Sequence, residues 1–288
     1  MVLRVSDPTA AERFYLEAFG VGLGSEIGFD VDDLEEAHAR AVAAGAEVVR
    51  APSEGRAAYR DPDGNLVQLT ERRRAVRTAG VDMAGGGWAV VVLEENRVVE
   101  AFRSESFAEA LLVVAEVVGV DIPIGIPEAG PRPADVEARR FVGARGSSVF
   151  PTPVRKVLEA PTYAEAREVA VELTGKSVSA QSYALRHRIL EVDQHASRDE
   201  RVIEVHPEVS FSELAHRPLL SKRRTDGLAE RRALLEEAGI EVPESVPRLA
   251  EPDLLDATIA AWSASRYACG EALALPEGHT ERIGAIWR

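Results

Sequence analysis

Five acidic residues sit at the ends of apolar segments, and their placement constrains the chain more than any other feature of its sequence. Asp82, Asp121 and Glu204 each lie in or directly after a short run of β-branched residues, whereas Asp253 and Asp256 open a long apolar helix pattern. Segments of this kind can deliver their carboxylates to one point of a folded domain. Carboxylates gathered at one point repel one another unless divalent cations balance them. The pattern therefore predicts a metal-binding acidic site suited to phosphodiester chemistry.

The first two acids are expected in or beside strands. Residues 79–93 are rich in valine, turn at 94–96 and continue as 97–102, which predicts a hairpin with Asp82 near the start of its first strand. Residues 111–119 are apolar with acids on one side, a pattern typical of a core-facing helix. Residues 118–127 have a buried-strand composition followed by prolines, so we expect Asp121 at the end or edge of a sheet.

The remaining acids are expected on a short strand and at a helix start. Residues 201–208 predict a strand that carries Glu204 and that Pro207 ends. Residues 251–274 predict a long helix, because Pro252 suits a first helical turn and the acids there face the positive end of the helix dipole. Asp253 and Asp256 are three residues apart, so they share one helical face.

Residues 79–288 resemble domain-of-unknown-function family 429, whose members are predicted nucleases with an RNase H-like fold. Seven segments carry the resemblance in order: GVDMAGGGW (80–88), DIPIGIP (121–127), RPADVEARRFVGARGSSVFPTP (132–153), TGKSVSAQSYAL (174–185), EVHPEVSF (204–211), KRRTDGLAERRALL (222–235) and DLLDATIAAWSA (253–264). The resemblance implies an α/β domain in which helices flank an RNase H-like mixed sheet. The last segment is also similar to the Asp-x-x-Asp-Ala helix of resolvases of the RuvC type, which implies metal binding for Asp253 and Asp256.

Phosphodiester hydrolysis on such a site calls for two Mg²⁺ or Mn²⁺ ions and for oxygen ligands. We expect Asp82 to bridge both ions, Asp121 and Asp256 to complete one shell each, and Asp253 and Glu204 to act as further ligands or to orient water. Ordinary roles remain open for two of these acids, since Asp253 also suits a helix N-cap and Asp121 a turn before Pro123. An ordinary role is harder to assign to Asp82, because an acid buried within a run of Gly and Val is costly unless it is paired or metal-bound.

Basic and polar residues near the motifs are candidates for binding substrate phosphates. The alternative for the basic ones is pairing with the many surface acids. His206 and Glu208 flank Pro207 and are expected beside the ligands, holding them or bound water in place. The candidates for substrate binding are Arg139, Arg140, Arg145, Ser147, Ser148, Lys222 and Arg223.

Residues 1–71 form a different module. Helices are expected over 8–19 and 33–44, strands over 46–49, 57–60 and 66–70, and a hairpin turn at 61–65. Residues 29–49 and 59–71 resemble the vicinal oxygen chelate (glyoxalase and bleomycin-resistance) superfamily. Its enzymes carry a histidine ligand on the first strand, where this chain has Val2, Leu3, Arg4 and Val5, so Glu71 alone remains of the ligand set. We therefore expect a truncated accessory module of α+β type that needs a partner for its sheet, either the other domain or a second copy in a homodimer.

Length and composition predict two domains, a glyoxalase-like module over 1–71 and an RNase H-like domain over 79–288, joined by a linker over 72–78. A single cysteine, Cys269, and the absence of a recognisable signal peptide or membrane span predict a cytoplasmic protein. The net charge of −14 argues against sequence-blind adhesion to nucleic acid over a wide face, so a nucleic acid or nucleotide substrate is expected on a local basic strip. Two alternatives to a nuclease remain: a binding or regulatory protein with a relict site, and a resistance-type protein that binds a small molecule through the N-terminal module.

Overall fold

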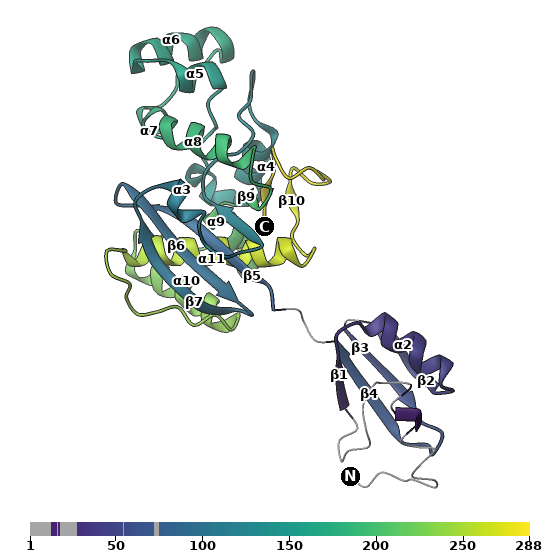
Figure 1. Ribbon diagram of the computed structural model, residues 1–288. Coiled ribbons are helices and arrows are strands. Elements are labelled where there is room, and N and C mark those ends of the chain that lie inside the picture. The colour runs from purple at the N-terminus through teal and green to yellow at the C-terminus, as the bar shows by residue number, and fades with distance from the viewer. Residues whose placement is uncertain (1–12, 16, 18–27, 54, 72–74) are drawn as a thin grey trace. The chain divides into compact units, whose positions relative to one another are not determined.

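The computed structural model describes residues 13–15, 17, 28–53, 55–71 and 75–288, which form two compact units, Met1–Ala75 and Val76–Arg288 (Figure 1). The division falls within the predicted linker. The first strand of the second unit begins at Arg77, two residues before the predicted domain start.

The N-terminal unit is a four-stranded sheet in the order β1-β4-β3-β2 with one helix packed on it. The strands pair in antiparallel fashion except β1, which runs parallel to β4. Its described elements are β1 (Gly28–Val31), α2 (Leu34–Ala43), β2 (Glu47–Ser53), β3 (Arg56–Arg60) and β4 (Leu66–Glu71). The core lies between α2 and alternate residues of β3 and β4, because side chains alternate between the two faces of a strand.

Sequence predicted most of this unit. The Asp33 side chain caps α2 by accepting from the Glu36 N–H, and Gly45 follows the helix with a left-handed φ of 88°. The turn after β3 closes because Asp61 accepts from the backbone N–H of Asn65 at 2.7 Å. The described residues 13–15 and 17 are helical, in agreement with the helix predicted over 8–19, whose other residues lie outside the described part, as do Val2, Leu3, Arg4 and Val5.

The second unit is built on a five-stranded mixed sheet in the order β7-β6-β5-β8-β9. The first three strands form an antiparallel meander, and β8 and β9 run parallel to β5. This is the mixed sheet that the RNase H-like prediction requires. Its strands are β5 (Arg77–Ala84), β6 (Gly87–Glu94), β7 (Arg97–Ser104), β8 (Val117–Val120) and β9 (Val202–Glu204), and a small separate pair is β10 (Ala274–Leu275) and β11 (Ile286–Trp287).

Two predictions in the first part of this sheet were wrong. The predicted two-stranded hairpin is a three-stranded meander, because Gly85 and Gly86 take left-handed φ values of 51° and 84° and reverse the chain between β5 and β6. Asp82 therefore lies near the end of its strand and not near the start. The helix predicted over 111–119 does not form: only Phe107–Ala110 (α3) is helical, and β-branched residues carry the chain into β8.

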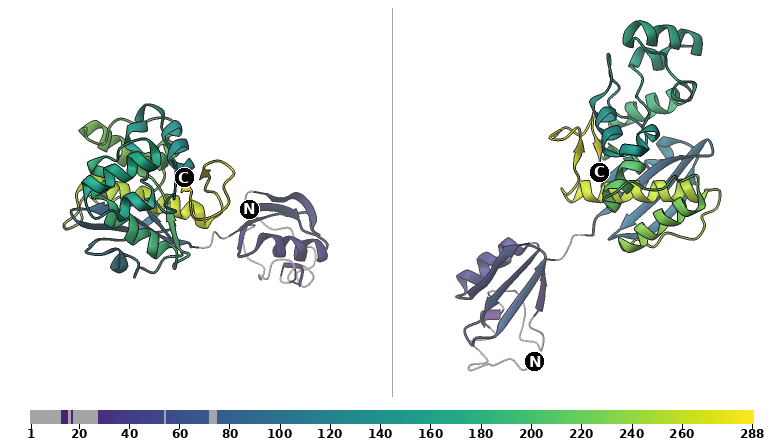
Figure 2. Two further views of the ribbon diagram at one scale, coloured as in Figure 1. Left: turned by 90° about the horizontal axis from the view of Figure 1, so that it is seen from above. Right: turned by 180° about the vertical axis from the view of Figure 1, so that it is seen from behind.

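Helices flank the sheet. Seen from behind in Figure 2, α10 and α11 lie over one of its faces, while α5 to α8 form a projection of the same unit (Figure 1). The helical bounds are α4 (Pro133–Phe141), the 3₁₀ helix η1 (Gly143–Ser148), α5 (Arg155–Glu159), α6 (Tyr163–Thr174), α7 (Ala180–Ala184), α8 (Arg186–Ala196), α9 (Pro207–Ala215), α10 (Thr225–Glu237) and α11 (Glu251–Ala268).

The two faces of the sheet belong to different cores. Ala79, Val81 and Val120 pack in one core with residues of α3 and α8. Ala89, Val91 and Leu93 pack in another with α10 and α11. A site on the α11 face therefore draws on alternate positions of the strands.

The last predicted elements are shorter than expected. The strand over 201–208 is Val202–Glu204, and Pro207 starts α9 where a strand end was predicted, because proline is well tolerated in a first helical turn. Helix α11 ends at Ala268, six residues before the predicted end. Across the described residues, no helix combines the length and the apolar character that crossing a membrane requires.

Candidate metal and phosphodiester site

Asp82 and Asp121 come together at the ends of two neighbouring parallel strands. Val81 of β5 stands beside Val120 of β8, and the Asp121 N–H donates to the Val81 carbonyl at 3.0 Å. Val81 and Val120 are paired across the two strands, and Asp82 and Asp121 are the residues that directly follow them. Side chains in register share a face of the sheet, so Asp82 and Asp121 point to the same side.

Two glycines allow helix α11 to lie directly against that side. A Cβ on Gly80 would stand 1.9 Å from the Ala257 carbonyl oxygen, and one on Gly119 would stand 2.7 Å from the Ala260 carbonyl oxygen. Because side chains alternate along a strand, Gly80 and Asp82 face the same way. Asp256, which directly precedes Ala257 in α11, is therefore held close to Asp82, and its residue surface is only 1% exposed.

These aspartates lie close enough that the charge of one raises the pKa of another. Burial raises the pKa of Asp82 well above its usual value, and the charges of Asp256 and Asp121 raise it further. Burial raises the pKa of Asp256 to about 6; Asp121 adds to this, while Lys222 opposes it. Burial also raises the pKa of the Asp121 and Asp253 carboxyls, against the lowering effect of Lys222. We call Asp82, Asp121, Asp253 and Asp256 the aspartate cluster.

Lys222 supplies a cation in contact with this cluster, and the charge of Arg231 also lowers the pKa of Asp256. Lys222 lies in the loop between α9 and α10, and its ammonium donates to Asp256 Oδ2. Burial alone would lower the pKa of Lys222, but Asp256, Asp121 and Asp82 outweigh that effect and raise it. Sequence placed Lys222 among the phosphate-binding candidates and did not foresee its contact with a predicted metal ligand.

Glu204 is not part of the cluster. Glu204 lies on β9 in register with Val120 of β8. Because Asp121 is one residue further along, Glu204 points to the sheet face opposite that of Asp121. There its carboxylate accepts from both terminal nitrogens of Arg132, one of them at 2.6 Å, and from the Ile124 N–H at 2.6 Å. Arg132 also binds Asp135 at 2.8 Å, and these two acids outweigh burial to raise the pKa of the guanidinium. The expected ligand or water-orienting role of Glu204 does not fit this geometry, because an internal cation already balances its charge.

His206 and Glu208 have different surroundings. The charge of His206 lowers the pKa of Asp121, so the ring lies beside the cluster, as expected. Its Nδ1 is buried and has no hydrogen-bond partner in the part of the chain that the structure describes. Glu208 is buried on α9 between two arginines, accepting from Arg145 at 2.8 Å and Arg231 at 2.8 Å. Glu208 is thus engaged in a structural ion pair, and Arg231, which sequence did not single out, connects it to the loop that carries Lys222.

The remaining substrate-binding candidates lie on α4, on η1 and in the Lys222 loop. Arg139 and Arg140 are exposed on α4, where Arg139 donates to the Val149 carbonyl. On η1, Arg145 is bound to Glu208, Ser148 donates to the Arg145 carbonyl at 2.7 Å, and Ser147 is exposed. Arg223 is exposed next to Lys222. Lys222 is therefore the candidate that the structure places at the aspartate cluster, and Arg223 is its exposed neighbour in sequence.

The donor set of the cluster fits Mg²⁺ or Mn²⁺, since all its ligand atoms are carboxylate oxygens and hard cations prefer oxygen. Mutual repulsion and burial also favour a cation there. In the described residues, however, no three His, Cys, Asp or Glu side chains are placed to hold a metal ion as they stand. The Lys222 ammonium stands against Asp256 within this set of carboxylates.

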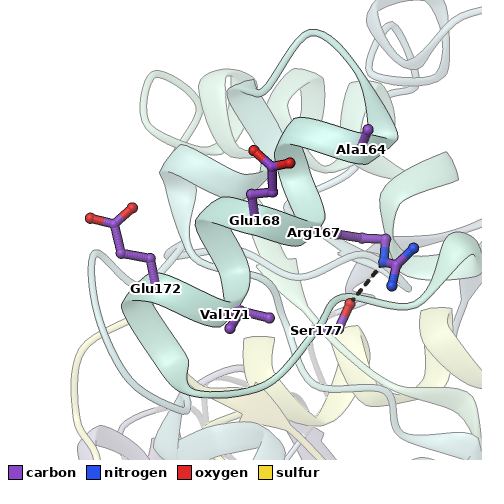
Figure 3. A pocket seen from close by; sticks show the side chains of 6 residues that line it. All are labelled: Ala164, Arg167, Glu168, Val171, Glu172 and Ser177. Carbon is purple, nitrogen blue, oxygen red and sulfur yellow. Dashed lines mark hydrogen bonds between the residues drawn. The ribbon is translucent and has the colours of Figure 1, made fainter.

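A separate hollow of about 570 Å³ lies on the projecting helices and contains none of the predicted site residues. It is lined by Ala164, Arg167, Glu168, Val171, Glu172 and Ser177, and Arg167 donates to Ser177 across it at 3.3 Å (Figure 3). All six residues are exposed. The hollow is therefore a surface feature of α6 and the turn that follows it, and it does not contribute to the aspartate cluster.

Two family models match the chain. A glyoxalase-like domain matches residues 24–70, which agrees with the resemblance of the N-terminal unit. No curated protein and no solved structure matches the chain. A protein family of unknown function, DUF429, matches residues 80–281, a span that contains the whole aspartate cluster and most of the second unit. The chain belongs to the DUF429 family.

Proposed function

We propose that the second unit hydrolyses phosphodiester bonds with the help of divalent cations held by the aspartate cluster. The observation that carries this proposal is the convergence of carboxylates from β5, from the end of β8 and from α11, on one face of an RNase H-like sheet. Their raised pKa values are typical of functional sites, because a fold has little structural reason to bury like charges together.

In this proposal Asp82, Asp121 and Asp256 hold Mg²⁺ or Mn²⁺, and Asp253 contributes from the first turn of α11. Divalent ions at such a site activate a water molecule and stabilise the leaving oxygen of the phosphodiester. The residues of the chain position these ions and exclude bulk water, since Asp82 and Asp256 are almost fully buried. His206 borders Asp121, and its buried Nδ1 has no hydrogen-bond partner among the described residues, so the ring is proposed to help position Asp121.

The substrate class follows from charge. Residues 76–288 carry 25 basic and 34 acidic side chains, so a long polyanion would be repelled over most of the surface. Lys222 offers local positive charge at the cluster, and the exposed Arg223 is its neighbour in sequence. A short or structured nucleic acid, or a nucleotide, is therefore the proposed substrate.

Hydrolysis of a panel of labelled DNA and RNA oligonucleotides in Mn²⁺ tests the proposal. The wild type is expected to cleave at least one member, and Asp82→Asn is expected to abolish cleavage. Asp226→Asn is the matched control. Asp226 is an exposed aspartate outside the cluster, and its carboxylate pairs with the Arg224 guanidinium at 2.7 Å. Cleavage retained by Asp82→Asn would overturn the assignment.

The alternative is a nucleic-acid-binding or nucleotide-binding protein without turnover, and one observation favours it. Lys222 already neutralises part of the cluster, and no three candidate ligands in the described part of the chain are placed for a metal ion. Binding assays with Asp82→Asn separate the two functions. Equal affinity with Mn²⁺ and with EDTA, together with no cleavage by the wild type, favours the binding protein.

The N-terminal unit is proposed to pair with a second copy of itself. Strand β2 is exposed along most of its length, and the outer sheet face presents Val49 and Leu66, which are 49% and 37% exposed. Exposed apolar side chains on an open sheet favour association. A homodimer through this face is consistent with the glyoxalase-like pattern, in which two such units combine.

A further inference from the structure

Lys222 reaches the aspartate cluster from a backbone that is held in place. The Leu220 N–H donates to the Glu230 carboxylate at 2.8 Å, and the Leu220 carbonyl accepts from the Arg231 guanidinium at 2.8 Å. Arg231 is 1% exposed and is itself bound to Glu208. The loop also packs tightly on α10, since a Cβ on Gly227 would stand 2.2 Å from the Ser221 carbonyl oxygen. The position of the Lys222 backbone is therefore a built feature of the fold.

The Lys222 side chain, by contrast, is free to leave. Its side chain is 45% exposed, whereas that of Asp256 is 2% exposed. Asp256 is its single salt-bridge partner among the described residues. Lysine has a flexible four-carbon stem and a strongly hydrated ammonium, so the ammonium can withdraw into water once the charge of an incoming divalent cation replaces its attraction to the carboxylates. The carboxylate cannot follow, because Asp256 lies on a helix that packs directly against β5.

We infer that Lys222 is an exchangeable counter-ion, which neutralises the aspartate cluster in the absence of metal and is displaced when a divalent cation binds. The inference rests on the proposed function, because it concerns the same cluster. It accounts for the contact of a lysine ammonium with one of several like-charged carboxylates, and for the finding that no three candidate ligands among the described residues are placed for a metal ion while the ammonium stands there. Once displaced, the ammonium stays at the edge of the cluster beside Arg223, where a substrate phosphate would contact both. Metal binding would then precede substrate binding.

Lysine labelling provides a direct test, because the chain has three lysines, Lys156, Lys176 and Lys222. Lys156 and Lys176 are exposed and serve as internal controls. The full-length protein is treated with an amine-acetylating reagent in EDTA and in Mn²⁺, and acetylation of each lysine is quantified by mass spectrometry. Lys222 is expected to react several-fold more slowly than the controls in EDTA and to approach their rate in Mn²⁺. Asp82→Asn is expected to remove this effect of Mn²⁺.

Calorimetric titration with Mn²⁺ alone supplies the second readout. Lys222→Met keeps the length of the stem and removes the competing charge, so Mn²⁺ affinity is expected to rise about tenfold, which corresponds to ~1.4 kcal/mol. Arg223→Met removes the neighbouring exposed charge and is expected to change the affinity less than about twofold, as exposed charges are well screened.

The outcomes separate this inference from the proposed function. If Mn²⁺ binds to the wild type but leaves Lys222 as slow to react as in EDTA, the exchange is wrong and the metal site stands. If Mn²⁺ binds neither the wild type nor Lys222→Met, the metal site itself is wrong, and the inference is lost with it. Binding by Lys222→Met alone would overturn the exchange as well, because Lys222 would then be a fixed counter-ion that keeps metal out of the wild-type site.

Discussion

Replacement of Asp256 by asparagine should change how the stability of the metal-free protein depends on pH. Asp256 is almost fully buried, and its pKa is raised from 3.8 to about 6, chiefly by burial. In the unfolded chain the carboxyl loses its proton near its ordinary pKa. Between these two values the unfolded state binds fewer protons than the folded state, so the free energy of unfolding falls as the pH rises.

The size of the effect follows from the pKa difference. A shift of about two units corresponds to roughly 3 kcal/mol, lost between about pH 4 and pH 6 and constant above pH 6. The asparagine in Asp256→Asn has no titratable carboxyl, so the free energy of unfolding of this variant does not include this loss. In EDTA, the stability of the wild type relative to Asp256→Asn should therefore fall by up to about 3 kcal/mol from pH 4 to pH 7. Lys222 loses its partner in the variant, but at 45% exposure water replaces the carboxylate.

Urea unfolding at a series of pH values, followed by tryptophan fluorescence, measures this difference. Trp88, Trp262 and Trp287 all belong to the second unit, so the signal reports on the unit that contains the cluster. Asp226→Asn is the control, because its exposed carboxyl has a lowered pKa. A stability difference between wild type and Asp256→Asn that stays within about 0.5 kcal/mol across the range, or that rises with pH, would refute the reasoning.

Two further predictions concern parts of the molecule outside the cluster. Arg132→Met should destabilise the second unit by about 3–5 kcal/mol in urea unfolding, because it leaves Glu204 and Asp135 buried without their shared cation. Adding Glu204→Met should recover part of the loss, and an unchanged unfolding midpoint in the single variant would contradict the buried ion pairs. Sedimentation velocity should show a dimer that Val49→Glu weakens, whereas a monomer at all concentrations would rule out pairing through the outer face of the N-terminal sheet.

Sequence predicted the three central aspartates because each obeys a local rule. Asp121 follows a short valine-rich run, Asp82 follows Gly80 and Val81 in a mostly buried strand, and Asp256 lies in the second turn of a helix with a proline start. These rules place an acid at the end of an element, and the ends of β5, β8 and α11 meet in the fold. Gly80 and Gly119, two residues before the aspartates, are what allow the helix to approach.

The position of Glu204 could not be predicted from the local sequence pattern. Glu204 has the same surroundings in sequence as Asp121, with an apolar strand before it and a proline shortly after it. Its role depends on register, and β9 pairs with β8 so that Glu204 stands beside Val120 and not beside Asp121. A shift of one residue moves a side chain to the other face of a sheet. Register is set by tertiary pairing, so inspection of the segment alone could not reveal it.

The Lys222 contact was hidden for a similar reason. Lys222 lies 34 residues before Asp256, in a loop whose path depends on the buried Arg231 and on Gly227. A run of basic residues in sequence indicates a solvated face or a phosphate contact. The insertion of one of them among carboxylates is a property of the folded loop.

The most direct test of the account is the position of Mn²⁺ in crystals soaked with that ion. Anomalous scattering is predicted to show Mn²⁺ bound by Asp82, Asp121 and Asp256, with the Lys222 ammonium withdrawn from Asp256. Crystals saturated with Mn²⁺ that show no anomalous peak beside these three carboxylates, and an ammonium still bound to Asp256, would contradict the central claim.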